Sequence, residues 1–234
     1  MNHTDFKEAR YLEKDWFSTF TLGHDDPGTR TWLDEGEKKL GCAPGWQEAS
    51  VEYYINDWRY RGELVPAMGA SAAFGCSYTF GYGINDPYPV LLDAVNCGLS
   101  GASNDQIARL AITYCKTFKP KKIYVMWTFK ARREHIHENG ALEKFRNLSE
   151  EAIKEELKSP TWLSSYLTLM NDKSDHYNYQ KNKLMLFNFC ENNNIVLRQK
   201  EILDLPKANF SLARDNDHPG PDWHTNIAGI LSEG

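Results

Sequence analysis

The sequence predicts an α/β protein built as a three-layer α/β/α sandwich, with a central parallel sheet of four to five strands. Two observations lead to this prediction. Apolar segments rich in β-branched and aromatic residues, of which 121–129 (KKIYVMWTF) is the clearest, alternate with segments of helical periodicity. The chain has 234 residues, 41% of them hydrophobic, which is enough for one large core. Strands that alternate with helices favour a parallel sheet covered on both faces.

The elements follow one another in a regular order. Residues 103–118 place Ile107, Leu110, Ala111 and Tyr114 on one helical face, and Ser103 is the expected N-cap. The closing helix is expected to be capped near Asp222. Strands are expected at 51–56, within 64–75, at 94–98, 121–129 and 194–199, with a possible last strand at 209–213, and helices within 87–95, at 103–118, 177–193 and 222–233.

The chain divides into a main domain and two less regular parts. Residues 1–50 are polar and rich in turn formers, which predicts an irregular or partly helical N-terminal extension packed on the core. Residues 51–234 form the expected main domain, with a helical insertion at about 135–190.

Composition excludes several classes of function. The net charge of −5 gives no basic surface for nucleic acid, and no apolar segment is long enough to span a membrane. The first residues show no apolar signal segment. The five cysteines are widely spaced without a CxxC pair, which favours reduced thiols over disulfides. We therefore expect a cytoplasmic protein with no nucleic-acid or membrane partner.

Four polar loops follow predicted strands or precede the last helix, and the carboxyl ends of parallel strands meet at one edge of a sheet. We therefore expect reactive residues to collect there. The four loops are 75–81 (GCSYTFG), 96–105 (NCGLSGASND), 127–135 (WTFKARREH) and 214–224 (RDNDHPGPDWH).

The first of these loops lacks the known glycine-rich signatures. It has no Gly-Lys-Ser/Thr ending of a phosphate loop, and Thr79 stands where the second glycine of a G-x-S-x-G elbow belongs. Residues 81–83 (GYG) lack the third glycine of a dinucleotide site, so we expect no cofactor. Two readings of Ser77 remain: a nucleophile whose hydroxyl faces the cleft, or a serine that only caps a helix.

The loop before the last helix favours the nucleophile. Asp215 and His218 lie three residues apart in a turn closed by Pro219. This spacing lets the carboxylate bind Nδ1 of the imidazole and leaves Nε2 free as a base. Together with a serine at a strand end, the pair predicts a Ser77, His218, Asp215 triad.

These segments resemble the SGNH (GDSL-type) hydrolase family over residues 52–130 and 195–232. Gly75-Cys76-Ser77 matches the first block of the family (Gly-Asp-Ser), Gly101 the second, and Asp215 to Pro219 the last. The lead-in at 53–64 (YYINDWRYRGEL) resembles the approach to the nucleophile strand in some members. The resemblance implies the flavodoxin-like form of the α/β/α fold and an oxyanion hole made by the N–H groups of Ser77 and Gly101.

The chain departs from the family at two places. Cys76 replaces the aspartate of the first block. The third block, Gly-x-Asn-Asp, is absent, so the usual asparagine donor to the oxyanion is missing. Asn104 is the first candidate to replace that donor, and Thr128 and Arg132, at the end of the third strand, are weaker ones that could also line the cleft.

Other residues have lower rank. Strand parity predicts that Cys76 faces the packed side, away from the cleft. Residues 135–138 (HIHE) could ligate a metal but lack a third ligand, so a solvated loop is expected and no metal. His224 is expected to cap the last helix or line the cleft. Trp127 and Trp223 are mostly expected in the core, with a possible role in stacking on a sugar ring.

The sequence therefore predicts a serine ester hydrolase of SGNH type that removes small acyl groups from a carbohydrate or another small-molecule ester through an acyl-enzyme on Ser77. Two alternatives remain open. One is an O-acyltransferase that uses the same triad, and the other is a non-catalytic binding or structural protein on the same scaffold. The oligomeric state is not predicted.

Overall fold

The structure is a computed structural model that describes residues 23, 25–31, 43, 51–136, 142–145 and 171–233. Within these residues, four strands form a parallel sheet in the order β4-β3-β5-β8. The strands are β3 (Ala72–Gly75), β4 (Val95–Gly98), β5 (Lys122–Trp127) and β8 (Val196–Glu201). The expected parallel sheet and its strand number are confirmed.

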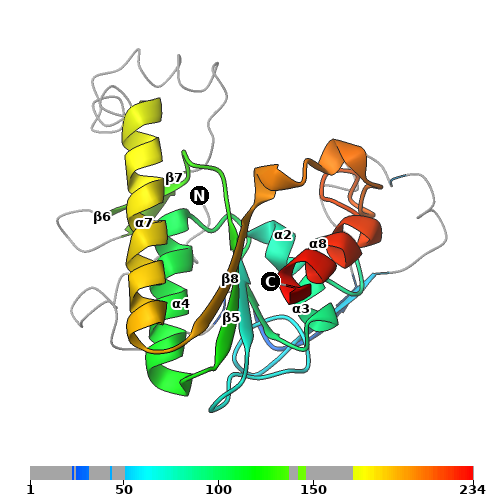
Figure 1. The fold of residues 1–234 in the computed structure, drawn as a ribbon. Helices are drawn as coiled ribbons and strands as arrows, with labels where there is room; N and C mark the ends of the chain where they lie inside the picture. The colour runs from blue at the N-terminus through cyan, green and yellow to red at the C-terminus, as the bar shows by residue number, and fades with distance from the viewer. Residues whose placement is uncertain are drawn as a thin grey trace.

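Helices cover the sheet on both faces, which confirms the three-layer class (Figure 1). On one face lie α4 (Asn104–Phe118) and α7 (Asp172–Asn192), which pack against each other. On the other face lie the short helices α2 (Ser77–Phe80) and α3 (Tyr88–Leu91) together with α8 (Pro221–Glu233).

Strand parity divides the core into two clusters. On β3, Phe74 packs in the cluster under α4 and α7, whereas Ala73 packs in the cluster under α8. On β5, Val125 and Tyr124 divide in the same way. Because successive side chains of a strand point to opposite faces, these short strands are buried on both sides, as their apolar sequences predict.

The two long helices begin at the caps that polar side chains provide. Oγ of Ser103 accepts the N–H of Gln106, so α4 starts as predicted. Helix α7 starts earlier than predicted, because Asn171 and Ser174 form a capping box in which each side chain accepts the backbone N–H of the other. The cap lies upstream of the apolar positions on which the prediction rested.

A second, antiparallel sheet lies outside the central one. Strand β2 (Glu52–Ile55), predicted as a strand, pairs with β1 (Gly28–Thr31). The expected extension at 1–50 therefore contributes a strand that its polar sequence did not predict. The N–H of Ala43 donates to the carbonyl of Arg214, so a further residue of 1–50 contacts the main domain.

Three predicted elements differ from the structure. Residues 142–145 form β7, which pairs with β6 (Arg133–Ile136) in an antiparallel hairpin, where we expected helical insertion material. Residues 146–170 of that insertion lie outside the described residues. Residues 209–213 form no strand: only a bridge from Leu212 to Pro219 occurs there, after two 3-10 helices (Ile202–Asp204 and Lys207–Asn209). Helix α8 begins one residue before Asp222, whose carboxylate accepts hydrogen bonds from Ser211 and from the backbone N–H of Trp223.

Candidate active site

Ser77 is the first residue of α2 and lies directly beyond the carboxyl end of β3. Strands β3 and β5 are neighbours in the sheet, and the chain continues from β3 into α2 and α3 on one face and from β5 toward α7 on the opposite face. Such a switch point is where open α/β sheets form their ligand crevice. The side chain of Cys76 is fully buried in the core, as strand parity predicted, so Ser77 is the residue of this loop that faces the site.

Two glycines let α2 lie against the strand ends. A Cβ on Gly75 would stand 1.9 Å from Oγ1 of Thr79, and a Cβ on Gly98 would stand 2.4 Å from the backbone N of Phe80. These separations are too short for a Cβ, so the glycine at the end of β4 is required by the close approach of the α2 backbone, and the glycine at the end of β3 by the side chain of Thr79. They bring the turn that carries Ser77 onto the edge of the sheet.

His218 and Asp215 lie in a tight turn before α8. The Oδ1 atom of Asp215 accepts the backbone N–H groups of Asp217 and His218, at 3.1 and 3.0 Å. Asn216 adopts a positive φ of 57°, which asparagine tolerates better than most residues, and the N–H of Ala213 closes the turn on the carbonyl of His218. The three-residue spacing therefore produces the carboxylate–imidazole geometry that it predicts.

The three predicted catalytic side chains form a continuous hydrogen-bonded chain. Nε2 of His218 lies 2.9 Å from Oγ of Ser77, and Nδ1 of the same ring lies 2.5 Å from Oδ2 of Asp215. Ser77 and His218 are 141 residues apart in sequence. Ser77 is 7% exposed and Asp215 is 4% exposed, so the chain is largely shielded from water.

The electrostatics fix the roles of the imidazole nitrogens. Burial alone would raise the pKa of Asp215, but the hydrogen bond and charge of His218, together with the N–H groups of His218 and Asp217, hold that pKa below its ordinary value. Asp215 is therefore ionised at neutral pH and accepts a hydrogen bond from the N–H at Nδ1. This leaves the lone pair of Nε2 facing the hydroxyl of Ser77.

Two tyrosines from the nucleophile segment flank the His218 ring. Tyr82 stacks on it with a centroid distance of 5.4 Å and an interplanar angle of 27°. Tyr78 meets it edge-on at 5.7 Å. These contacts restrict the imidazole to the orientation that meets Ser77, and Tyr82 places the negative face of its ring against it.

Arg61 holds the backbone that follows the nucleophile. This guanidinium is 3% exposed and donates to the carbonyls of Phe80, Gly81, Ile84 and Asn85. Its Cζ lies 4.2 Å from the ring centroid of Tyr53, whose hydroxyl accepts the N–H of Gly83. Burial lowers the pKa of Arg61 to about 10, so it remains a cation at neutral pH.

The N–H groups of Ser77 and Gly101 have no acceptor among the described residues. Gly101 adopts a φ of 71° in the turn between β4 and α4. Both N–H groups are therefore free for the oxyanion role, which stays a prediction because no substrate or oxyanion is present.

Asn104 is engaged elsewhere. Its Nδ2 donates to the carbonyls of Thr128 and Phe129, at 3.4 and 3.1 Å, and its Oδ1 accepts the N–H of Thr128 at 3.0 Å. The side chain therefore ties the start of α4 to the end of β5. An oxyanion role for Asn104 would require one of these bonds to break, and it stays a prediction.

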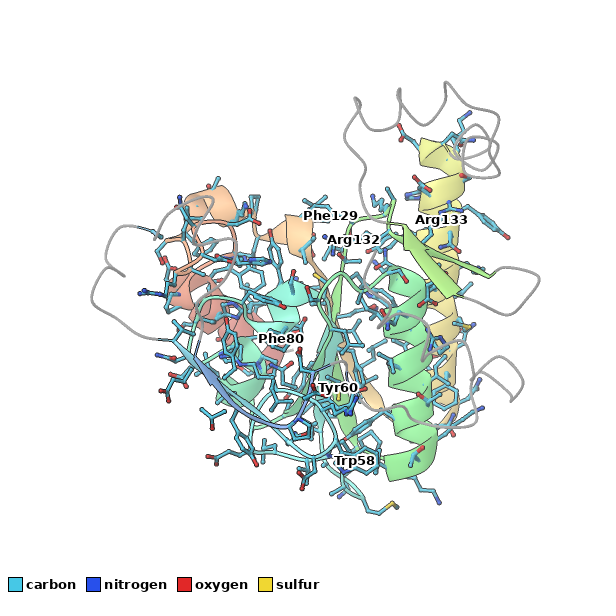
Figure 2. The ribbon with its side chains drawn as sticks, turned by 180° about the vertical axis from the view of Figure 1, so that it is seen from behind. Trp58, Tyr60, Phe80, Phe129, Arg132 and Arg133 are labelled. Carbon is cyan, nitrogen blue, oxygen red and sulfur yellow. The ribbon has the colours of Figure 1, made fainter. Side chains whose placement is uncertain are left out.

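Thr128 and Arg132 do lie together at the carboxyl end of β5, beside β3. Nη1 of Arg132 donates to Oγ1 of Thr128 at 3.0 Å, and its Cζ lies 5.1 Å from the ring centroid of Phe129. In Figure 2 the labelled Phe129 and Arg132 lie on the loop beyond the sheet. Thr128 is buried and Arg132 is half-buried.

His224 does not line the cleft. It is 0% exposed, its Nδ1 accepts the backbone N–H of Tyr88 at 3.1 Å, and its ring stacks on that of Tyr88. Burial, followed by the charges of Arg61 and His218, lowers its pKa to about 3, so the ring is neutral. Its function here is to join α8 to α3.

Trp127 and Trp223 are also 0% exposed, so neither ring is available to stack on a sugar. Both belong to the core clusters because their strand and helix positions face inward. The other aromatic rings at the site, those of Tyr78 and Tyr82, come from the nucleophile segment itself.

Sequence reasoning missed the role of Arg61 and the two tyrosines, Tyr78 and Tyr82, that flank His218. The segment 53–64, which resembles the approach to the nucleophile strand in some family members, could have pointed to Arg61, but no role was assigned to this residue from the sequence. The role depends on the carbonyls of a loop about 20 residues away, which sequence spacing does not reveal.

Within the described part of the chain, no group of three His, Cys, Asp or Glu side chains could hold a metal ion. Of the segment 135–138, residues 137 and 138 lie outside that part. None of the helices described there has the length and apolar character needed to cross a membrane.

No family model matches the chain, and no curated protein matches it. Among solved structures, the chain is similar to a "putative lipolytic protein of G-D-S-L family" from Desulfitobacterium hafniense DCB-2, with 15% identity and a TM-score of 0.33 over 70% of this chain and 98% of that one. It is also similar to LAE5, an alpha/beta hydrolase enzyme from the metagenome of Lake Arreo, Spain, with 16% identity and a TM-score of 0.32 over 70% and 94%. These likenesses are distant, and we base the function on the geometry of the site.

Proposed function

We propose that this protein is a serine ester hydrolase of SGNH type. One observation supports this most strongly: Oγ of Ser77 lies 2.9 Å from Nε2 of His218, whose Nδ1 lies 2.5 Å from the buried Asp215. A nucleophile in contact with a base that is itself oriented by a carboxylate is the arrangement that activates serine.

The reaction proceeds through an acyl-enzyme. Oγ of Ser77 attacks the ester carbonyl as Nε2 of His218 takes the hydroxyl proton, and Asp215 stabilises the imidazolium that forms. The imidazolium then protonates the leaving alkoxide as the carbonyl–oxygen bond breaks. Water, deprotonated by His218, attacks the acyl-enzyme and releases the acid and free Ser77.

The N–H groups of Ser77 and Gly101 would stabilise the negative charge on the carbonyl oxygen during both steps. Gly101 is suited to this because its positive φ turns the backbone sharply between β4 and α4. We propose a small acyl group on a carbohydrate or another small ester as substrate, by analogy with the family that the sequence resembles.

The site argues against a non-catalytic scaffold. Holding an ionised Asp215 at 4% exposure is unfavourable unless its hydrogen bonds persist, and a serine that only caps a helix needs no histidine. The side chain of Ser77 is directed at Nε2 of His218 and caps no backbone N–H among the described residues.

Labelling with a fluorophosphonate, followed by mass spectrometry, tests the proposal. We expect phosphonylation of Ser77, together with hydrolysis of a short-chain aryl ester such as 4-nitrophenyl acetate. Labelling and hydrolysis should be lost in Ser77→Ala, and in His218→Ala the rate should fall by about 10³-fold or more.

His176→Ala is the matched control, because His176 is an exposed histidine of α7 and should leave the labelling rate unchanged. A folded wild-type protein that neither labels at Ser77 nor cleaves the aryl ester would refute the proposed function.

A further inference from the structure

Three arginines lie around the carboxyl end of β5 and the hairpin that follows it. Arg109 pairs with Glu134 at 2.8 Å, and Arg133 pairs with Asp175 at 2.7 Å. Arg132 has no carboxylate partner among the described residues. The charges of Arg109 and Arg133 are neutralised by their carboxylate partners, whereas the half-buried guanidinium of Arg132 can bind an anionic group of a ligand.

The contacts of Arg132 leave the Nε and Nη2 edge of its guanidinium without an acceptor among the described residues. Nη1 is bound to Oγ1 of Thr128, and the group lies against the ring of Phe129. Its Nε is buried and has no acceptor within the ranges that the structure describes. A buried donor without an acceptor is unfavourable, and the edge made by Nε and Nη2 is suited to bind two oxygens of a planar anion.

Arg132 lies at the same end of the sheet as the candidate triad. Thr128 directly follows β5, the strand beside β3, and Ser77 lies at the end of β3. Burial raises the pKa of Tyr78 to about 12, while the nearby charge of Arg132 acts in the opposite direction. The ring of Tyr78 in turn touches that of His218.

The loop of Arg132 is held in place before any ligand binds. The backbone N–H of Glu134 donates to the carboxylate of Asp105 at 3.1 Å. That carboxylate also accepts hydrogen bonds from Asn178 and Asn182 of α7. A cation fixed in this way binds an anion without a large loss of side-chain and loop entropy.

We propose that Arg132 binds a carboxylate of the substrate, so that this enzyme prefers esters that carry a carboxylate close to the scissile bond. The inference rests on the proposed function and adds the substrate class. One guanidinium that has no carboxylate partner in the described part of the chain matches the single negative charge of a carboxylate and its planar pair of oxygens.

Two matched pairs of esters test this and locate the carboxylate. The first pair is 4-nitrophenyl hemisuccinate and 4-nitrophenyl butyrate, which differ by a carboxylate in the acyl group. The second is 4-acetoxybenzoate and its methyl ester, which differ by a carboxylate in the alcohol group. The measured quantity is the ratio of kcat/KM for the charged ester to kcat/KM for the neutral one.

We expect Arg132→Gln to lower this ratio by about tenfold or more for one of the two pairs of esters. The reason is that hydrogen bonds between charged groups are stronger than those between neutral groups. Arg132→Lys should restore part of the ratio, because it keeps the charge but not the two-donor edge. A change in KM larger than that in kcat for the charged ester would identify a binding role.

Lys130→Gln is the matched control for net charge, because Lys130 lies in the same loop but faces the ring of Tyr179. It should leave both ratios within about twofold. If Ser77 labels and the neutral esters are cleaved, but Arg132→Gln changes neither ratio, the carboxylate site is refuted and the esterase survives. Failure to label Ser77 would refute the proposed function and this inference with it.

Discussion

The two segments that provide the candidate triad are held in place by different kinds of contact. The nucleophile segment, residues 75–83, depends on residues far away in sequence, above all Arg61 and Tyr53. The base turn, residues 213–218, is stabilised mainly by its own hydrogen bonds, in which Asp215 accepts from backbone two and three residues on. The relation of Asp215 to His218 is thus a local property, whereas the position of Ser77 is a tertiary one.

The two segments meet at Gly83. Its carbonyl accepts the N–H of Arg214, and a Cβ at this position would lie 3.0 Å from the backbone N of Asp215. The geometry between Ser77 and His218 should therefore respond to changes on either side of this contact, but by different amounts.

The largest effect is expected on the nucleophile side. Arg61→Met would leave four main-chain carbonyls without their donors, and we expect a loss of at least about 3 kcal/mol in the free energy of unfolding. Urea unfolding measures this loss. Arg59→Met, which removes only a partly exposed ion pair with Asp26, should cost less than about 1 kcal/mol. Equal losses in the two variants would contradict the dependence on Arg61.

The next largest effect is expected from a change at Gly83, where the two segments meet. Gly83 has a φ of +72° and lies against Ala213, so Gly83→Ala combines an unfavourable backbone conformation with crowding. We expect a loss of about 2–3 kcal/mol and slower labelling of Ser77.

Gly69→Ala separates the two causes, because Gly69 has a φ of +79° but no neighbour within 4 Å of the added Cβ. It should cost only about 1 kcal/mol and leave labelling unchanged. If both variants label at the wild-type rate, the packing of Gly83 on the base turn has no part in positioning the triad.

His224 should make the free energy of unfolding depend on pH. This residue joins α8, the helix after the base turn, to α3, the helix after the nucleophile segment. Its pKa falls from the ordinary 6.5 to about 3 in the folded protein, so the unfolded chain binds a proton first as the pH falls. The stability that neutral His224 contributes is complete above the unfolded pKa and is lost progressively down to the folded pKa.

Between pH 7.5 and pH 5 this linkage amounts to about 2 kcal/mol. His224→Gln, which does not titrate, should be less stable than the wild type at pH 7.5 but should lose about 2 kcal/mol less on acidification. Urea unfolding at the two pH values gives both quantities. Parallel pH profiles of the two proteins would show that His224 does not titrate in this window.

The smallest effect is expected from the tyrosine that stacks on His218. Tyr82→Leu removes the aromatic face and should slow labelling of Ser77 by about two- to tenfold, the size of one aromatic contact. Tyr82→Phe keeps the ring and should label at close to the wild-type rate. Slow labelling of Ser77 in the Tyr82→Phe variant would instead show that the hydroxyl of Tyr82 is needed.

The regular elements of the fold were predictable because each has a local signature. The apolar runs of β3 and β5, the N-cap Ser103 and the helical periodicity after it all refer to neighbours within a few residues. Strand β1 and the hairpin of β6 and β7 were not, because their polar sequences form strands only through pairing with a partner strand.

The same division applies to the site. Asp215 and His218 could be paired from their spacing, because a turn brings residues i and i+3 together. Asn104 was assigned to the oxyanion by its distance from Gly101 in sequence, yet its amide binds the backbone after β5, a segment 24 residues away. Spacing along the chain does not report which acceptor a buried amide reaches.

The sequence by itself determined the α/β class, the order of the central strands along the chain, the base turn and the identity of the serine at the end of β3. Only the tertiary structure decided that Ser77 meets His218 across 141 residues, that Arg61 holds the loop after Ser77, and that Arg132 meets no carboxylate among the residues that the structure describes. The physical reason is the range of the interactions. Strand and helix propensities, caps and turns act over a few residues, whereas a buried guanidinium or imidazole is placed by whichever carbonyls, carboxylates and rings the packed layers bring to it.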